Sequence, residues 1–336
     1  MTSNEQKGEQ RSVLIVDAMN LFVRSYCAHP QMNSNGEAIG GAIGFLKTLK
    51  KLLVEQQPRA VYVAWEGGGS QRRRKIFPEY KLNRRPEKLN RFYEDDLPDS
   101  DENKQQQIVT LLGMLKCVPV CQLYVPDCEG DDVVAYLCKG PLRDLEKVIA
   151  SSDKDLYQLL DDRTKIYNLH KKTYLTKEDV LTEFRVTARN FGLAKALCGD
   201  PSDNVPGIKG LGFKTVSKLY PFLGTENDVL LQEIFDFAAA NREQSSIHKR
   251  VFEQQDDVKR NWKLVYLDGS MLSATQASSI DYVVGTFKPR ADRMGLVRCL
   301  AKEGVGDFDV EGFFYACNAI ENVSYEAITR PTRKST

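Results

Sequence analysis

The sequence holds only three histidines, and none of its eight cysteines lies in a CxxC pair. Structural zinc sites are usually built from closely spaced Cys and His ligands, so this composition argues against one. Most of the cysteines lie within apolar runs, where we expect them to be reduced. Reduced cysteines are typical of the cytoplasm, so we expect a cytoplasmic protein.

Long apolar runs are missing as well. No stretch approaches the ~20 apolar residues needed to cross a bilayer, and residues 1–11 are polar without an apolar signal core. We also find no internal repeat and no coiled-coil pattern. The sequence thus argues against a membrane or exported protein, and its 336 residues suggest about two domains.

Two oppositely charged segments follow one another, although the net charge is only +1. Residues 71–91 contain nine basic and two acidic residues, and residues 94–102 contain six acidic and no basic residues. Such separation favours a polyanionic partner on one surface and cations on another. The alternative is a solvated, charged loop.

Alternating strand and helix patterns predict an α/β fold with a parallel sheet. Apolar runs at residues 13–16 and 61–65 predict strands that end at Asp17 and Glu66, and helical spacing over residues 39–54 predicts the helix between them. The alternation resumes with helices at residues 105–116 and 131–139, an extended segment at 118–125 and a strand at 147–150.

These patterns divide the chain. We predict an α/β domain over residues 12–185, with an inserted flap at about 67–104 that is too long for an ordinary connection. A mainly helical domain is predicted over residues 186–325. Residues 1–11 and 326–336 are expected to be disordered tails.

Carboxylates gather where the predicted strands and turns end. The nine candidates are Asp17, Glu66, Glu129, Asp131, Asp132, Asp153, Asp155, Asp200 and Asp203. Each alone has a simple explanation as a helix cap or turn residue. The carboxyl ends of parallel strands, however, meet at one crevice, so these acids are expected to converge.

Converging carboxylates need protons or cations. Two such charges about 6 Å apart repel by roughly 3 kcal/mol at an effective dielectric near 20. Oxygen ligands without His or thiolate suit Mg²⁺ or Mn²⁺. Two such ions are the usual arrangement for hydrolysing a phosphodiester, so the acids predict a nuclease-like metal site.

A glycine-rich turn lies between two predicted helices, at residues 188–198 and 213–222. It contains Gly207, Lys209, Gly210, Gly212, Lys214 and Thr215. Glycines allow close approach of a ligand, and the following helix start would offer free amides to a phosphate. The turn therefore predicts contact with a nucleic-acid backbone, and the alternative is a tight turn between packed helices.

Aromatic residues alternate with basic residues in the predicted flap. They are Phe77, Tyr80, Phe92 and Tyr93. Aromatic rings stack on unpaired bases while Arg and Lys follow phosphates, a combination typical of proteins that bind single strands. The alternative is a partly buried aromatic contact in a surface loop.

In their order along the chain, these motifs resemble those of the structure-specific 5′ nucleases, the flap endonuclease and 5′-to-3′ exonuclease superfamily. The resemblance is to bacterial or phage members without a fused polymerase. The matching segments are 16–20, Arg73 with 80–84, 129–132, 152–155 and 199–214. The resemblance implies a PIN-like parallel-sheet core, a helical arch, and a helix-three-turn-helix at about 188–223.

The resemblance also implies roles for individual residues. The acids would hold two or three Mg²⁺ or Mn²⁺ ions, with Asp132 and Asp203 lying beside the ligands. Lys81 and Arg84 would stabilise the scissile phosphate, Tyr80 would stack on a nucleotide, and Arg73 belongs to the same arch set. The glycine turn would bind duplex DNA, and in the family it often carries K⁺. Glu66 departs from the family's usual Asp.

The implied activity is metal-dependent hydrolysis near a 5′ flap or a 5′ single-stranded end of DNA, for removal of RNA primers or flaps in replication and repair. RNA–DNA hybrids and replication proteins are further partners that the family suggests, and we expect a monomer. Two alternatives stay open: a PIN-like ribonuclease, and a branched-DNA binder whose acids hold no metal.

Overall fold

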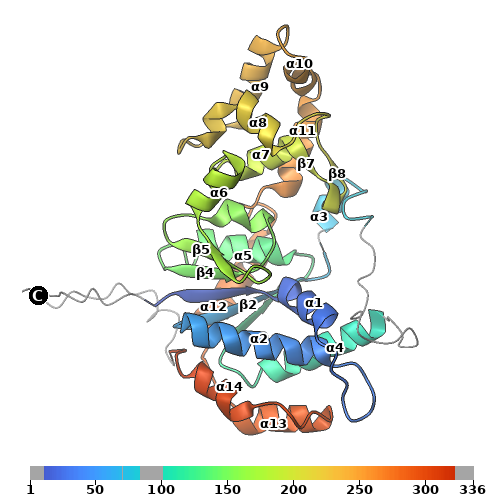
Figure 1. The fold of residues 1–336 in the computed structure, drawn as a ribbon, viewed down its shortest axis with the longest axis vertical. Coiled ribbons are helices and arrows are strands. Elements are labelled where there is room, and N and C mark those ends of the chain that lie inside the picture. Colours follow the sequence, from blue (N-terminus) through green and yellow to red (C-terminus); the bar gives the residue numbers. More distant parts are fainter. Residues whose placement is uncertain (1–10, 70, 84–100, 322–336) are drawn as a thin grey trace, which may run out of the picture.

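A computed structural model describes residues 11–69, 71–83 and 101–321, and its centre is a six-stranded sheet (Figure 1). The strand order is β3-β2-β1-β4-β5-β6, and every neighbouring pair is parallel except β5 and β6. The strands are β1 (Val13–Asp17), β2 (Ala60–Trp65), β3 (Cys121–Tyr124), β4 (Lys147–Ala150), β5 (Thr164–Asn168) and β6 (Thr173–Leu175).

Helices cover both faces of the sheet because its central strands are apolar on both sides. On one face, Leu14 and Val16 pack among α1 (Ala18–Ala28), α2 (Gly40–Gln56), α4 (Asp101–Leu115), α13 (Arg293–Lys302) and α14 (Val310–Cys317). On the other face, Val13 and Ile15 pack with α5 (Gly130–Lys139), the 3₁₀ turn η1 (Asp155–Leu159) and α12 (Ala274–Thr286).

A helical lobe forms the upper half of the molecule in Figure 1. It has a third core, around Leu197, Val216 and Tyr220. Its elements are α6 (Lys177–Phe184), α7 (Phe191–Cys198), β7 (Gly199–Asp200), η2 (Pro201–Asp203), β8 (Val205–Pro206), α8 (Phe213–Leu219), η3 (Pro221–Gly224), α9 (Leu231–Asn241), α10 (Ser246–Glu253) and α11 (Gln255–Val265). Helix α3 (Gln71–Ile76) packs beside α11.

The structure differs from the sequence prediction in the last third of the chain. The prediction placed residues 186–325 in one helical domain, but Ile280 of α12, Leu296 of α13 and Phe313 of α14 pack on the two sheet faces. Helical periodicity shows that one face of a helix is buried and does not show what covers it.

Within the described ranges, no helix is long and apolar enough to cross a membrane.

Glycines bring α1 and α2 close together. An added Cβ at Gly40 would lie 1.8 Å from the carbonyl oxygen of His29, and one at Gly44 would lie 2.1 Å from the imidazole of His29. These separations are far shorter than a van der Waals contact, so the helix pair depends on glycine here. The pair in turn sets the position of Asp17, which starts α1.

Replacing Gly40 by Ala should therefore destabilise the protein by roughly 1–3 kcal/mol, because the backbone of α1 must move. Gly113→Ala is the matched control: it lies in α4 with nothing within 4 Å of the added Cβ, and should stabilise by up to about 1 kcal/mol through helix propensity. Urea unfolding midpoints measure both. Equal midpoints for Gly40→Ala and the wild type would contradict the close approach.

Candidate metal centre

The carboxyl edge of the sheet carries the first acids, as the strand pattern predicted. Asp17 ends β1 and caps α1 by accepting a hydrogen bond from the amide of Asn20 (3.1 Å). Its other oxygen accepts one from the hydroxyl of Ser151 (2.8 Å), which directly follows β4. Glu66 directly follows β2 and adds negative charge near Asp17.

Most of the remaining acids come from segments that follow the strands or belong to the helical lobe. Asp155, Asp200 and Asp203 offer carboxylate oxygens that lie within 4.8 Å of one another. Asp153 links the two groups, because its charge acts on Asp17 and Asp131 and is itself acted on by Asp200 and Asp203. The predicted convergence of the acids is therefore present.

Burial among like charges perturbs the central carboxylates. Burial, followed by the charges of Asp153 and Glu66, raises the pKa of Asp17 to about 6, although hydrogen bonds from Asn20 and Ser151 oppose the shift. Burial, Asp153 and Asp17 raise the pKa of Asp131 well above its usual range. Among the described residues neither carboxylate has an ion-pair partner, and the charge of Lys81 does not outweigh burial and the like charges at Asp131.

Glu129 behaves differently and leaves one oxygen unused. Burial alone would raise its pKa, but the charges of Arg73 and Lys81 and the hydrogen bonds from Lys81 and Tyr80 lower it. Its Oε2 accepts hydrogen bonds from Lys81 (2.8 Å) and Tyr80 (3.1 Å), whereas the buried Oε1 has no hydrogen-bond partner. An ionised carboxylate with an unused buried oxygen, beside three clustered aspartates, fits a divalent cation.

Asp132 pairs with a buried Arg73 beside the candidate ligands. Both oxygens of Asp132 accept hydrogen bonds from the Arg73 guanidinium, at 2.6 and 2.8 Å, so Asp132 is engaged as a partner of Arg73 and not as a metal ligand. Arg73 is 1% exposed and also donates to the carbonyl of Leu264 (2.8 Å). It therefore positions α3, α5 and α11, and its enclosure does not fit the catalytic role that the resemblance implied.

Tyr80 is likewise buried, at 4% exposure, and its hydroxyl proton is shared between Asp203 and Glu129, whose oxygens each lie 3.1 Å away. Its ring faces are covered in this structure, which does not fit the predicted stacking on a nucleotide. Lys81 is better placed: its ammonium stands beside Glu129 and 3.8 Å from Asp203. Arg84, Phe92 and Tyr93 lie outside the described residues.

Lys195 is a site residue that the sequence analysis missed. It lies in α7, is 7% exposed, and forms ion pairs with Asp155 and with Asp200 (2.6 Å). That ammonium and hydrogen bonds from Ser202 lower the pKa of Asp200 against the opposing effect of burial. A lysine inside the otherwise apolar run of residues 191–198 was the available signal.

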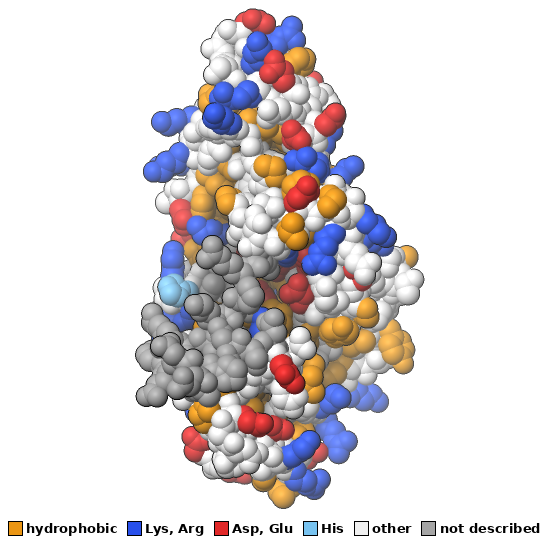
Figure 2. Space-filling model, turned by 90° about the vertical axis from the view of Figure 1, so that its right-hand side faces the viewer, with side chains coloured by type: hydrophobic (Ala, Val, Ile, Leu, Met, Phe, Trp, Pro, Cys, Tyr) orange, Lys and Arg blue, Asp and Glu red, His pale blue; other side chains and the backbone are white. Residues whose placement is uncertain are grey.

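The glycine turn packs tightly against the end of α7. An added Cβ at Gly207 would lie 1.9 Å from the carbonyl oxygen of Cys198, and Gly210 has a left-handed backbone (φ 90°). Lys209 and Lys214 are exposed, and α8 begins directly after Gly212. On the face shown in Figure 2, Lys and Arg side chains are spread over the helical half of the molecule. DNA and K⁺ binding at this turn stay predictions.

Known proteins share this sequence pattern. Residues 12–185 match the family model described as the 5′–3′ exonuclease, N-terminal resolvase-like domain. The chain is 33% identical to a thermostable DNA polymerase I of Thermus aquaticus over 77% of this chain and 28% of that protein. It is 30% identical to a 5′–3′ exonuclease of Aquifex aeolicus over 66% of this chain and 72% of that protein. It thus spans about a quarter of the polymerases it matches.

Solved structures share the fold, which confirms the predicted fold class. The bacteriophage T5 flap endonuclease, in a pseudo-enzyme-product complex with DNA and metal ions, has a TM-score of 0.61 at 20% identity, covering 91% of this chain and 99% of that chain. Flap endonuclease-1 of Methanococcus jannaschii has a TM-score of 0.52 at 15% identity, covering 93% and 92% of the two chains.

The raised pKa of Asp17 predicts a pH dependence of stability. Its folded-state pKa of about 6 exceeds the usual 3.8, so its contribution to stability is present below 3.8 and is lost as pH rises through about 6. The shift corresponds to roughly 3 kcal/mol. In EDTA, Asp17→Asn should therefore be more stable than the wild type at about pH 8 and equal to it near pH 4.

Urea unfolding across this pH range, with and without Mg²⁺, measures the effect. Asp144→Asn is the matched control, because that side chain is 84% exposed and should follow the wild type. Mg²⁺ should stabilise the wild type and stabilise Asp17→Asn much less. If Asp17→Asn is less stable than the wild type at every pH in EDTA, Asp17 does not carry an uncompensated buried charge.

Proposed function

Because the chain belongs to the 5′–3′ exonuclease family, we propose that it is a divalent-metal-dependent, structure-specific 5′ nuclease. The observation that supports this most directly is the acidic cluster, in which the buried Asp17 interacts with the half-buried Asp131 and Asp153, and Glu129 leaves an oxygen unused. Hydrolysis of a phosphodiester is the chemistry that such a carboxylate cluster serves with Mg²⁺ or Mn²⁺.

The residues of the site would have different roles in the reaction. The carboxylates of Asp17, Glu129 and Asp131, with the group of Asp155, Asp200 and Asp203, would hold two or three cations. When bound there, such ions would supply a water of lowered pKa and would neutralise charge on the phosphate. Lys81 places a partly exposed ammonium beside the acids, where it would attract a phosphate of the bound strand. Arg73 and Tyr80 fix Asp132, Glu129 and Asp203.

The proposed substrate is DNA with a 5′ flap or a 5′ single-stranded end. Exposed Lys209 and Lys214 at the glycine turn would contact the duplex backbone without reading its sequence. Two solved structures with a similar fold, those of the T5 flap endonuclease and the catalytic core of Rad2, are complexes with DNA, which supports the same class of ligand here. We further propose K⁺ at the turn, action on RNA–DNA hybrids, a monomer, a cytoplasmic location and contacts with replication proteins.

A cleavage assay tests the nuclease function. Labelled 5′-flap DNA and single-stranded RNA are incubated with the protein in Mg²⁺ or in EDTA. We expect Mg²⁺-dependent cleavage near the flap junction, and a loss of roughly 10²-fold or more for Asp153→Asn, because that change removes a charge at the centre of the acidic cluster. Asp144→Asn, on an exposed loop, should cleave as the wild type does.

Two results would refute the proposal in favour of its alternatives. Cleavage of single-stranded RNA but not of the flap would identify a PIN-like ribonuclease. Tight binding of the flap without Mg²⁺-dependent cleavage would identify a branched-DNA binder. Binding of the flap is therefore measured alongside, in Ca²⁺ and in EDTA.

A further inference from the structure

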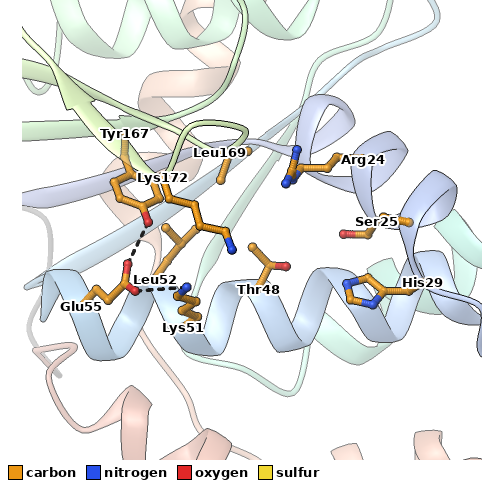
Figure 3. Close-up of a pocket in the computed structure, with 11 residues that line it drawn as sticks. Arg24, Ser25, His29, Thr48, Lys51, Leu52, Glu55, Tyr167, Leu169 and Lys172 are labelled. Carbon is orange, nitrogen blue, oxygen red and sulfur yellow. Dashed lines mark hydrogen bonds and ion pairs between the residues drawn. The ribbon is translucent and has the colours of Figure 1, made fainter.

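A cavity of about 290 Å³ lies on the nuclease core away from the glycine turn, between α1, α2 and the β5–β6 hairpin (Figure 3). Three basic side chains line it from three different elements: Arg24 of α1, Lys51 of α2 and Lys172 of the hairpin. Figure 3 shows Arg24 and Lys172 reaching toward the same space. Leu52 and Leu169 supply part of an apolar wall.

The charges of the cavity do not balance. Its lining holds one carboxylate, Glu55, which is already engaged by Lys51 (3.5 Å) and by the hydroxyl of Tyr167 (3.0 Å). Three cations against one carboxylate leave two positive charges, those of Arg24 and Lys172. Burial, Lys47 and Arg24 lower the pKa of His29, so the imidazole in the lining is a neutral hydrogen-bonding group at pH 7.

Lys172 occupies an unfavourable backbone conformation. Its φ is +56°, in the left-handed region that glycine and asparagine adopt more readily, and lysine there costs about 1 kcal/mol. The hairpin enforces it: the amide of Lys172 donates to the carbonyl of Asn168 (2.7 Å), whose side chain accepts from the amides of His170 and Lys171. Strain kept at a charged residue over a cavity indicates a function for that charge.

Arg24 is held toward the cavity and connected to the metal centre. Its guanidinium lies 3.2 Å from Nδ1 of His170, whose amide donates to Ser152. The amide of Ser152 donates to the side chain of Asn20, one turn after Asp17 on α1. Arg24 follows Asp17 by seven positions, a rise of about 10 Å along α1. These contacts link Arg24, on one side of the cavity, to the edge of the sheet that carries the acids.

We propose that this cavity binds the phosphate group of a nucleotide, with Arg24 and Lys172 as the anion ligands. The volume exceeds that of a bare phosphate and accommodates an attached sugar against the apolar wall. The inference rests on the proposed function for the source of the nucleotide, because a nuclease offers two: a phosphate of the bound strand, or a released 5′-mononucleotide. Both present the same chemistry to the pocket.

Titrations of the full chain in EDTA test the pocket without cleavage. The probes are thymidine 5′-monophosphate, thymidine as its phosphate-free control, and a 12-nucleotide single strand, each followed by calorimetry. Lys172→Asn is the main variant, because asparagine adopts the left-handed backbone without strain. Lys171→Asn is its matched control: that lysine is exposed in the same hairpin and is outside the cavity lining.

We expect Lys172→Asn and Arg24→Gln each to weaken phosphate binding about tenfold, the loss of one charge-assisted contact, while Lys171→Asn binds as the wild type does. A tenfold loss with the mononucleotide identifies the released product as a ligand. A loss with the strand alone identifies a strand phosphate, and then the slope of log K against log salt should fall by about one charge.

Equal affinities of Lys172→Asn and Lys171→Asn for every probe would overturn the inference. So would equal binding of thymidine and its monophosphate if Lys172→Asn and Arg24→Gln also bind the 12-nucleotide strand as the wild type does. Flap cleavage by the same variants in Mg²⁺ is recorded separately. Because the titrations contain no metal, a failed pocket and a failed nuclease assignment give different results.

Discussion

Like-charged carboxylates buried at one edge of a parallel sheet are the constraint on which this structure depends. The protein neutralises part of that charge itself: Arg73 pairs with Asp132, Lys81 with Glu129, and Lys195 with Asp155 and Asp200. Among the described residues Asp17 and Asp131 form no ion pair, although the charge of Lys81 acts on Asp131, and both take up protons more readily than usual. The internal cations therefore surround the place where an external cation would compensate the most charge.

The site depends on both halves of the molecule. The sheet supplies Asp17 and Glu66, whereas Asp200 and Asp203 come from the short segment after α7 in the helical lobe. The base of the inserted flap ties the halves together, because the amide of Lys81 donates to the carbonyl of Asp203 (2.9 Å) and Asn83 donates to Asn204 (2.9 Å). The metal centre is complete only when the lobe and the flap base are in place.

The sequence predicted the strands and the acids well, because both leave local signals. The buried strand at residues 13–16 is a continuous apolar run, and the acids follow strands where parallel topology brings them together. Helix α1 was missed because it starts on Asp17 with no turn after β1. Sequence carries no direct record of burial, so Arg73 and Tyr80 were assigned to a substrate although both are enclosed, and Lys195 was not recognised.

The guanidinium of Arg73 has a consequence for motion. It joins three elements: α3, which carries it, α5 through Asp132, and α11 through the carbonyl of Leu264. Separating any two of these elements would leave a buried charge without its partner, at a cost of about 3–5 kcal/mol. Molecules in which the elements have separated would therefore make up less than about one in a hundred. The sheet and the helical lobe should therefore rotate and translate as one rigid body while a substrate enters and leaves.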